Sequence, residues 1–290
     1  PSIAGAGSAG GLAGGAAGSE KLLATVTHNG AMATQTYTDN GGTTPTGAGP
    51  LPVGSTGAWA SLPQLGTARI GAGVAAAQDP SNGNVWYLYA AGGNSGTLAA
   101  PTSLSSVEFL PITVTNSGSV QTQAVTTWTA ATSALSAARW TAAALPATAA
   151  NNNKISGNAT YLYVAGGSTT SLTSFNNTVE VALVNAGGQL AAFTDTGSKN
   201  MPRPGYGGAL VNNQMMAFGG FQAGAATTAS VTAQLTTATM LSNFNALGGG
   251  TLLQNRALQG TALESAFIYQ LGGANAGPNS AQNTTEQTIW

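Results

Sequence analysis

Short apolar runs that end in a Gly-Gly pair recur four times along this chain. The runs occupy 86–91, 161–165, 214–218 and 267–271. The glycines that close them are Gly92-Gly93, Gly166-Gly167, Gly219-Gly220 and Gly272-Gly273. Nearly continuous apolar runs of this length, bounded by turn residues, are typical of strands buried on both faces. No stretch keeps the 3.6-residue period of a helix, so the pattern predicts an all-β protein.

Other segments alternate between apolar and polar residues, as half-exposed strands do. Three of them, 23–37, 112–123 and 181–193, hold two such runs around an Asn-containing turn. Asn-Gly between alternating runs is a strong hairpin signal. Each repeat is therefore predicted to have an inner buried pair and an outer exposed pair of strands. Such units, repeated around an axis, form the blades of a β-propeller.

An arginine precedes each apolar run, and an aromatic residue lies ten to twelve positions before each arginine. The arginines are Arg69, Arg139, Arg203 and Arg256, and the aromatics are Trp59, Trp128, Phe193 and Phe244. Glu108, Glu180 and Glu286 also recur at one outer-strand position. Matched positions in repeats indicate shared structural roles. We expect the arginines to donate hydrogen bonds to backbone carbonyls; anion binding in a central channel is the alternative.

At these positions the repeats resemble those of the kelch family. That family has a Gly-Gly pair closing its second strand, an aromatic in the outer strand, and a Pro/Arg-containing link between repeats. Residues 201–220, with Pro202, Arg203 and Pro204 before the Gly219-Gly220 pair, match best. The resemblance covers about residues 59–290 and implies a kelch-like β-propeller, with about four to five recognisable blades where the family usually has six or seven. It implies a fold alone, because propellers serve as enzymes, lectins and scaffolds.

The chain divides into three predicted parts. Residues 1–19 form a Gly/Ala-rich arm, either flexible or threaded against a neighbour; 20–59 form an N-terminal β segment with a hairpin; and 60–290 form the propeller. The last repeat ends at the third strand of a blade, at 285–290. The N-terminal segment is one source for a fourth strand, a neighbouring copy is another, and an incomplete chain is the third interpretation.

Charge is scarce in this sequence. Of 290 residues, 7 are Lys or Arg and 8 are Asp or Glu, against about 25% charged residues in ordinary domains. A neutral surface is cheap to desolvate, so it favours packing against copies of the same protein, or a coat of carbohydrate. Seven scattered basic residues form no phosphate-binding stripe, which argues against a nucleic-acid partner. No apolar run of 18 residues predicts a membrane span.

Residues that commonly bind metals or act in catalysis are also scarce. There is no cysteine, and His28 is the single histidine, so we expect no metal site, no cofactor and no catalytic residue. The kelch oxidases that carry a copper radical need two histidines and a cysteine-linked tyrosine, which this chain lacks. Asn158, Asn176 and Asn283 match the N-glycosylation pattern. Trp140 follows Arg139 directly and is a candidate for stacking on a sugar, a role that requires an exposed ring.

These observations favour a non-enzymatic, extracellular or cell-surface structural protein whose partners are copies of itself, in a filament or surface layer. A glycan-binding, lectin-like propeller is the alternative, because the loops after the Gly-Gly pairs are neutral and rich in hydroxyl and amide groups. A hydrolase using scattered carboxylates is a distant third, since the acidic residues are not paired in the sequence.

Overall fold

The computed structural model describes residues 61–117, 120–199, 203–248, 250–264 and 267–289. These residues form strands, turns and loops, with no helix among them. The propeller unit comprises Leu62–Trp290. The predictions for the arm at 1–19 and for the β segment at 20–59, which includes His28 and Trp59, lie outside the described residues.

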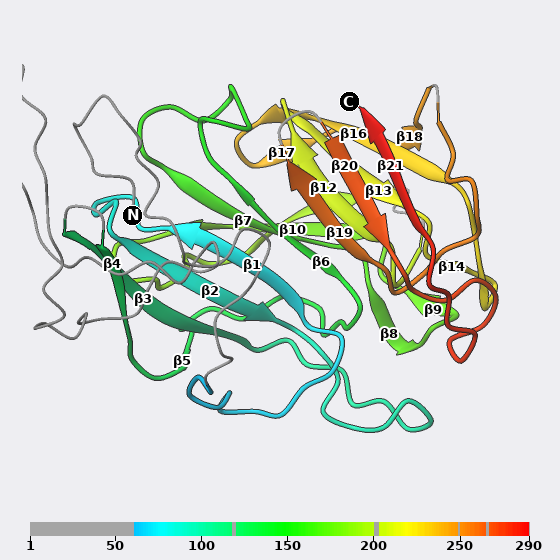
Figure 1. Cartoon of the computed structure of the whole chain (residues 1–290), viewed down its shortest axis with the longest axis horizontal. Helices are drawn as coiled ribbons and strands as arrows, with labels where there is room; N and C mark the ends of the chain where they lie inside the picture. Colours follow the sequence, from blue (N-terminus) through cyan, green and yellow to red (C-terminus); the bar gives the residue numbers. More distant parts are fainter. Residues whose placement is uncertain (1–60, 118–119, 200–202, 249, 265–266, 290) are drawn as a thin grey trace, which may run out of the picture. The chain divides into compact units, whose positions relative to one another are not determined.

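Four antiparallel sheets follow one another along the described chain and confirm the predicted all-β propeller arrangement (Figure 1). The first blade is β1 (Gly73–Gln78), β2 (Val85–Ala91), β3 (Val107–Ser117), β4 (Val120–Val125) and β5 (Thr129–Ala130). The second is β6 (Ala143–Ala147), β7 (Thr160–Ala165), β10 (Thr178–Val184) and β11 (Thr194–Ser198). The third is β12 (Gly207–Val211), β13 (Gln214–Phe218), β16 (Ser230–Thr237), β17 (Met240–Leu241) and β18 (Asn245–Ala246). The fourth is β19 (Gly260–Glu264), β20 (Phe267–Leu271) and β21 (Thr285–Ile289).

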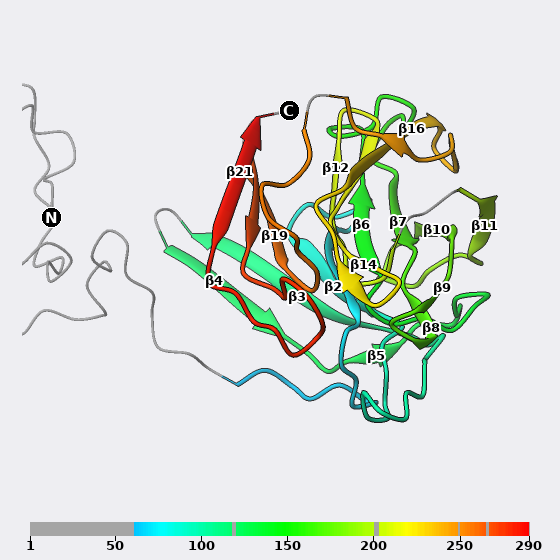
Figure 2. The same ribbon diagram turned by 90° about the vertical axis from the view of Figure 1, so that its right-hand side faces the viewer.

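Each blade is built in the same way. Its first two strands form a hairpin, and its third strand pairs with the other side of the second. The residue before each Gly-Gly pair lies opposite the start of the third strand, as in Ala91↔Val107 and Ala165↔Val179. The innermost strands β1, β6, β12 and β19 are neighbours in that order (Figure 2). The loops after two of the glycine pairs carry small hairpins, β8 (Ser168–Ser171) with β9 (Ser174–Phe175), and β14 (Phe221–Gln222) with β15 (Ala225–Ala226).

The cores of this protein lie between blades. Strand β7 shows why, because its successive side chains point to opposite faces. Leu162 and Val164 pack with residues of the first blade. Tyr163 and Ala165 pack with residues of the third blade. A strand buried on both faces needs an apolar residue at nearly every position, which explains the continuous apolar runs.

The Gly-Gly pairs allow one blade to approach the next. Both glycines of every pair have positive φ, for example 66° at Gly219 and 92° at Gly220. A Cβ added at Gly219 would overlap the Arg256 carbonyl of the following blade. The N–H of Gly220 donates to that same carbonyl at 2.7 Å. Glycine is therefore required here for its backbone conformation and also for the space it leaves.

Substituting Gly219 with alanine separates these two requirements. Gly157 is the matched control, because its φ is 65° and no atom would lie within 4 Å of an added Cβ. We expect Gly157→Ala to cost about 1–2 kcal/mol of unfolding free energy from backbone strain. Gly219→Ala should cost about 1–3 kcal/mol more, because the blades must move apart. Urea unfolding of both variants measures the difference, and equal losses would contradict the packing role.

Candidate functional site

Three of the four repeat arginines form the same buried clamp inside a blade. Arg139 Nη1 donates to the carbonyls of Gly166 at 3.1 Å and of Thr178 at 3.2 Å, and Nη2 contacts the Glu180 carboxylate. That carboxylate also accepts the N–H of Ser136 at 2.6 Å. Each clamp therefore ties the glycine pair, the third strand and the segment before the arginine together.

The two other clamps repeat these contacts. Arg256 Nη1 donates to the Gly272 carbonyl at 2.6 Å, and Nη2 lies 2.8 Å from Glu286 Oε1. Arg69 donates to the Gly92 carbonyl at 2.6 Å and pairs with Glu108. The Arg139 and Glu180 side chains are fully buried.

Burial pulls the pKa of Arg139 below its usual value, and the adjacent carboxylate of Glu180 opposes that shift. A buried charge pair held in this way, with hydrogen bonds from and to the backbone, has the features of a structural ion pair.

The third blade departs from this pattern. Strand register places Val231 where the other blades have glutamate, since Val231 lies opposite Ala217, two residues before Gly219. Arg203 donates instead to Gln222 Oε1 at 3.2 Å, while its Nε and Nη1 have no hydrogen-bond partner among the described residues. Burial lowers the pKa of Arg203. The common role expected for all four arginines therefore does not extend to Arg203, and the missing glutamate was visible in the sequence.

Asp79 links the first blade to the second. Its Oδ1 accepts from the N–H and the hydroxyl of Ser81, at 2.7 and 2.6 Å. Its Oδ2 accepts from the Tyr87 hydroxyl and from the N–H of Gly187 at 3.1 Å. Burial alone would raise the pKa of Asp79, but these hydrogen bonds outweigh it and hold the pKa well below its usual range. Burial and the neighbouring carboxylate raise the pKa of Tyr87 to about 12.

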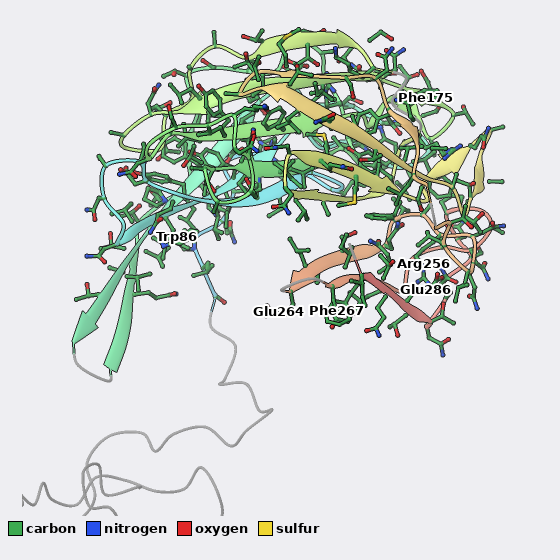
Figure 3. The ribbon with its side chains drawn as sticks, turned by 90° about the horizontal axis from the view of Figure 1, so that it is seen from above. Trp86, Phe175, Arg256, Glu264, Phe267 and Glu286 are labelled. Carbon is green, nitrogen blue, oxygen red and sulfur yellow. The ribbon has the colours of Figure 1, made fainter. Side chains whose placement is uncertain are left out.

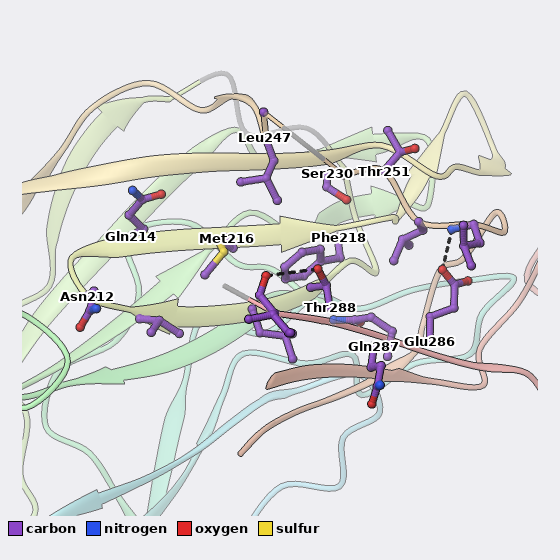
Figure 4. Close-up of a pocket in the computed structure, with 18 residues that line it drawn as sticks. Asn212, Gln214, Met216, Phe218, Ser230, Leu247, Thr251, Glu286, Gln287 and Thr288 are labelled. Atoms are coloured by element: carbon purple, nitrogen blue, oxygen red, sulfur yellow. Dashed lines mark hydrogen bonds between the residues drawn. The ribbon is translucent and has the colours of Figure 1, made fainter. Parts of the chain in front are cut away.

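A cleft of about 760 Å³ opens between the third and fourth blades (Figure 4). Met216, Phe218 and Ile268 give it an apolar lining, and Gln214 is among the amide groups along it. Gln270 also lines the cleft; it is buried, and its Nε2 has no hydrogen-bond partner in the part of the chain that the structure describes. The volume suits a small ligand, and the lining suits a neutral one.

In the described part of the chain, the two end blades each have a sheet face with exposed apolar side chains that no other blade covers. On the first blade Val74 is 66% exposed, and Trp86 is also exposed. On the fourth blade Leu271 is exposed and Ile289 is 69% exposed. Phe267 lies on the same face, which points away from the core that β20 shares with the third blade. Figure 3 labels Trp86 on the first blade and Phe267 on the fourth.

The sequence-based expectation for Trp140 is wrong. The side chain is 3% exposed, so no ring face is open to a sugar. It is buried because residue 140 is bridged to Ser168 and its ring lies against Gly71 of the preceding blade.

The glycosylation candidates differ in exposure. Asn158 and Asn283 are exposed. Asn176 is half-buried, and its Oδ1 accepts the N–H of Thr178 at 2.8 Å.

Breaking a clamp should destabilise the protein in proportion to its burial. Glu180→Gln leaves the buried Arg139 without a counter-charge, so we expect a loss of about 3–5 kcal/mol in unfolding free energy. Glu286→Gln should cost less, because the Glu286 side chain is 10% exposed and water can partly replace the charge. Urea unfolding at neutral pH measures both, and equal losses would contradict the ranking.

Asp79 should make stability depend on pH in the acid range. Its folded pKa lies below the ordinary value of 3.8, so the carboxylate stabilises the fold above that pH. This contribution is lost as pH falls through about 4 toward the lower folded pKa. The unfolding free energy of Asp79→Asn should therefore fall less between about pH 5 and pH 2 than that of the wild type. Parallel curves in urea titrations would count against this assignment.

No protein-family model matches this chain, and a comparison with curated proteins found no match. Among the described residues, no group of three or more histidine, cysteine or acidic side chains is placed to hold a metal ion. The described residues also include no helix with the length and apolar character to cross a membrane.

Proposed function

We propose that this chain is a non-enzymatic, extracellular structural protein, a kelch-like propeller subunit that assembles with copies of itself into a filament or surface layer. The observation that carries the proposal is the pair of uncovered apolar faces at the two ends of the row of blades. The blade faces between those ends pack against their neighbours in apolar cores.

The energetics favour covering these faces. Burying apolar surface gains about 25 cal/mol per Å², and Val74, Leu271 and Ile289 each leave much of their side chain in water. The low charge of the chain removes the repulsion that keeps many proteins apart. Large exposed apolar side chains that share one sheet face are a feature of interaction sites.

The carboxylates give little support to a hydrolase. Glu108, Glu180 and Glu286 are each engaged by an arginine and by backbone N–H groups. Asp79 is engaged by Ser81, Tyr87 and Gly187. A glycoside hydrolase needs two carboxyl groups facing one substrate.

Carbohydrate binding is a second candidate, favoured by the cleft between the third and fourth blades. Its amide groups and apolar floor match the hydroxyls and the C–H faces of a neutral sugar. A glycan array tests it: binding by the wild type that is lost in Gln214→Ala would support this function, and no binding would remove it.

Self-assembly is tested directly by the oligomeric state. We expect polymers in negative-stain images and a concentration-dependent mass in sedimentation, persisting at 1 M NaCl because apolar contacts are not screened by salt. Leu271→Asp should weaken association at least tenfold. Leu253→Asp is the matched control, because Leu253 is 87% exposed and lies outside both end faces. A wild-type monomer at every concentration would overturn the proposal.

A further inference from the structure

The two ends of the row of blades carry complementary, unused backbone groups. Two positions after each repeat arginine, the backbone has positive φ, at Gly71, Thr141, Gly205 and Leu258. The N–H at this position donates to the carbonyl of its equivalent in the preceding blade, from Thr141 to Gly71 at 2.6 Å and from Leu258 to Gly205 at 2.6 Å. The series leaves the Gly71 N–H and the Leu258 carbonyl without a partner among the described residues.

The glycine pairs show the same complementarity. In the first blade, the carbonyl of Arg139 from the next blade lies directly over Gly92 and accepts the N–H of Gly93 at 2.8 Å. In the third blade, the carbonyl of Arg256 lies over Gly219 in the same way and accepts the N–H of Gly220 at 2.7 Å. In the fourth blade no described residue fills this place. A Cβ added at Gly272 would meet Gln282 O at 3.5 Å and nothing nearer. The carbonyl that would fill this place belongs to the arginine of a first blade, Arg69.

Side-chain packing follows the same register. Gly73 is four residues after Arg69, and Ala144 is five residues after Arg139, the arginine of the next blade. A Cβ added at Gly73 would lie 3.0 Å from the Ala144 Cβ. A Cβ at Gly208 would lie 2.8 Å from the Ala143 Cβ. The unused members of this series are Gly260, where an added Cβ meets only Leu271 at 3.9 Å, and Val74, which is 66% exposed.

We propose that the first blade of a second copy docks head to tail on the fourth blade, continuing the contacts that successive blades make within the chain. In this interface Val74 of one copy packs on Gly260 of the other, and the Arg69 carbonyl lies over Gly272 and accepts the N–H of Gly273. The Leu258 carbonyl accepts the N–H of Gly71. The inference rests on the proposed self-assembly and specifies its interface.

Head-to-tail contacts generate closed rings or open filaments. Two copies would close as a ring of eight blades, within the range known for propellers. A rise between copies would instead give a helical filament.

The outer edge of β21 is consistent with this partner. The third strands β3, β10 and β16 are paired along both edges, whereas β21 pairs with β20 alone among the described residues. In the chain, the aromatics Trp128, Phe193 and Phe244 lie directly before β5, β11 and β18, which pair with those outer edges. Trp59 occupies the equivalent place before Arg69.

Gly272→Ala tests the interface without disturbing a contact inside the chain. Its φ of 58° matches the 65° of Gly157, so Gly157→Ala controls for backbone strain. We expect equal unfolding midpoints for the two variants in urea, and an association constant at least tenfold lower for Gly272→Ala alone in sedimentation. Polymers that form equally well in both variants would overturn this interface while leaving self-assembly standing. A wild type that never assembles would instead overturn the proposed function.

Engineered cysteines decide which copy supplies the partner, because the native chain has none. A mixture of Val74→Cys and Gly260→Cys single variants should give disulfide-linked dimers under mild oxidation. A mixture of Leu253→Cys with Gly260→Cys, the control, should stay at least tenfold less linked. In the double variant Val74→Cys/Gly260→Cys we expect a linked dimer on a denaturing gel if two copies close a ring, or a ladder of linked oligomers if they form a filament. An internally linked monomer in that lane would show that the ring closes within one chain and would overturn the proposal.

Discussion

The architecture depends on how closely one blade's backbone approaches the glycine pair of the blade before it. A carbonyl directly above the first glycine of the pair leaves no room for any side chain there. That approach sets the distance between sheets, and the sheet faces must then fill the remaining space with alanine, leucine, valine and aromatic side chains. The backbone contact therefore sets the spacing of the blades, and the apolar side chains on both faces of each strand fill that spacing.

Many of the few charged residues in this chain belong to the three clamps. Three of its 7 basic residues and three of its 8 acidic residues are in the buried pairs Arg69–Glu108, Arg139–Glu180 and Arg256–Glu286. A buried ion pair is weak evidence for added stability, and its better-attested effect is to fix one arrangement among several. Here each pair holds the segment before the arginine over the third strand, which aligns the next hairpin. The third blade keeps the propeller arrangement with Val231 in the glutamate position, so the clamp adjusts the contact between blades and does not create it.

The blades could be predicted from the sequence, but the burial of individual side chains could not. Strand positions followed from the apolar runs, and the structural placement of Glu108, Glu180 and Glu286 followed from their recurrence. Burial of Trp140 did not, because it depends on whether a blade precedes that position. The equivalent residues Pro204 and Ala257 are buried as well, whereas Ile70 in the first blade is 47% exposed. The cleft between the third and fourth blades was equally hidden, since its lining comes from strands far apart in the sequence.

The exposure of Ile70, whose equivalents in the later blades are buried, bears on how two copies would associate. Repeat arrays normally end in units with a polar outer face, but the ends here expose Ile70, Val74, Leu271 and Ile289. The two ends also differ in what they offer. The first blade presents the Arg69 carbonyl and the Gly71 N–H, and the fourth presents the Gly273 N–H and the Leu258 carbonyl over the open Gly272. Two first blades facing each other would both bring a carbonyl, with no glycine pair to receive it. An isologous dimer through like ends would leave these groups buried and unpaired, at about 1–3 kcal/mol each. The positions of these backbone groups therefore favour head-to-tail assembly over an isologous dimer.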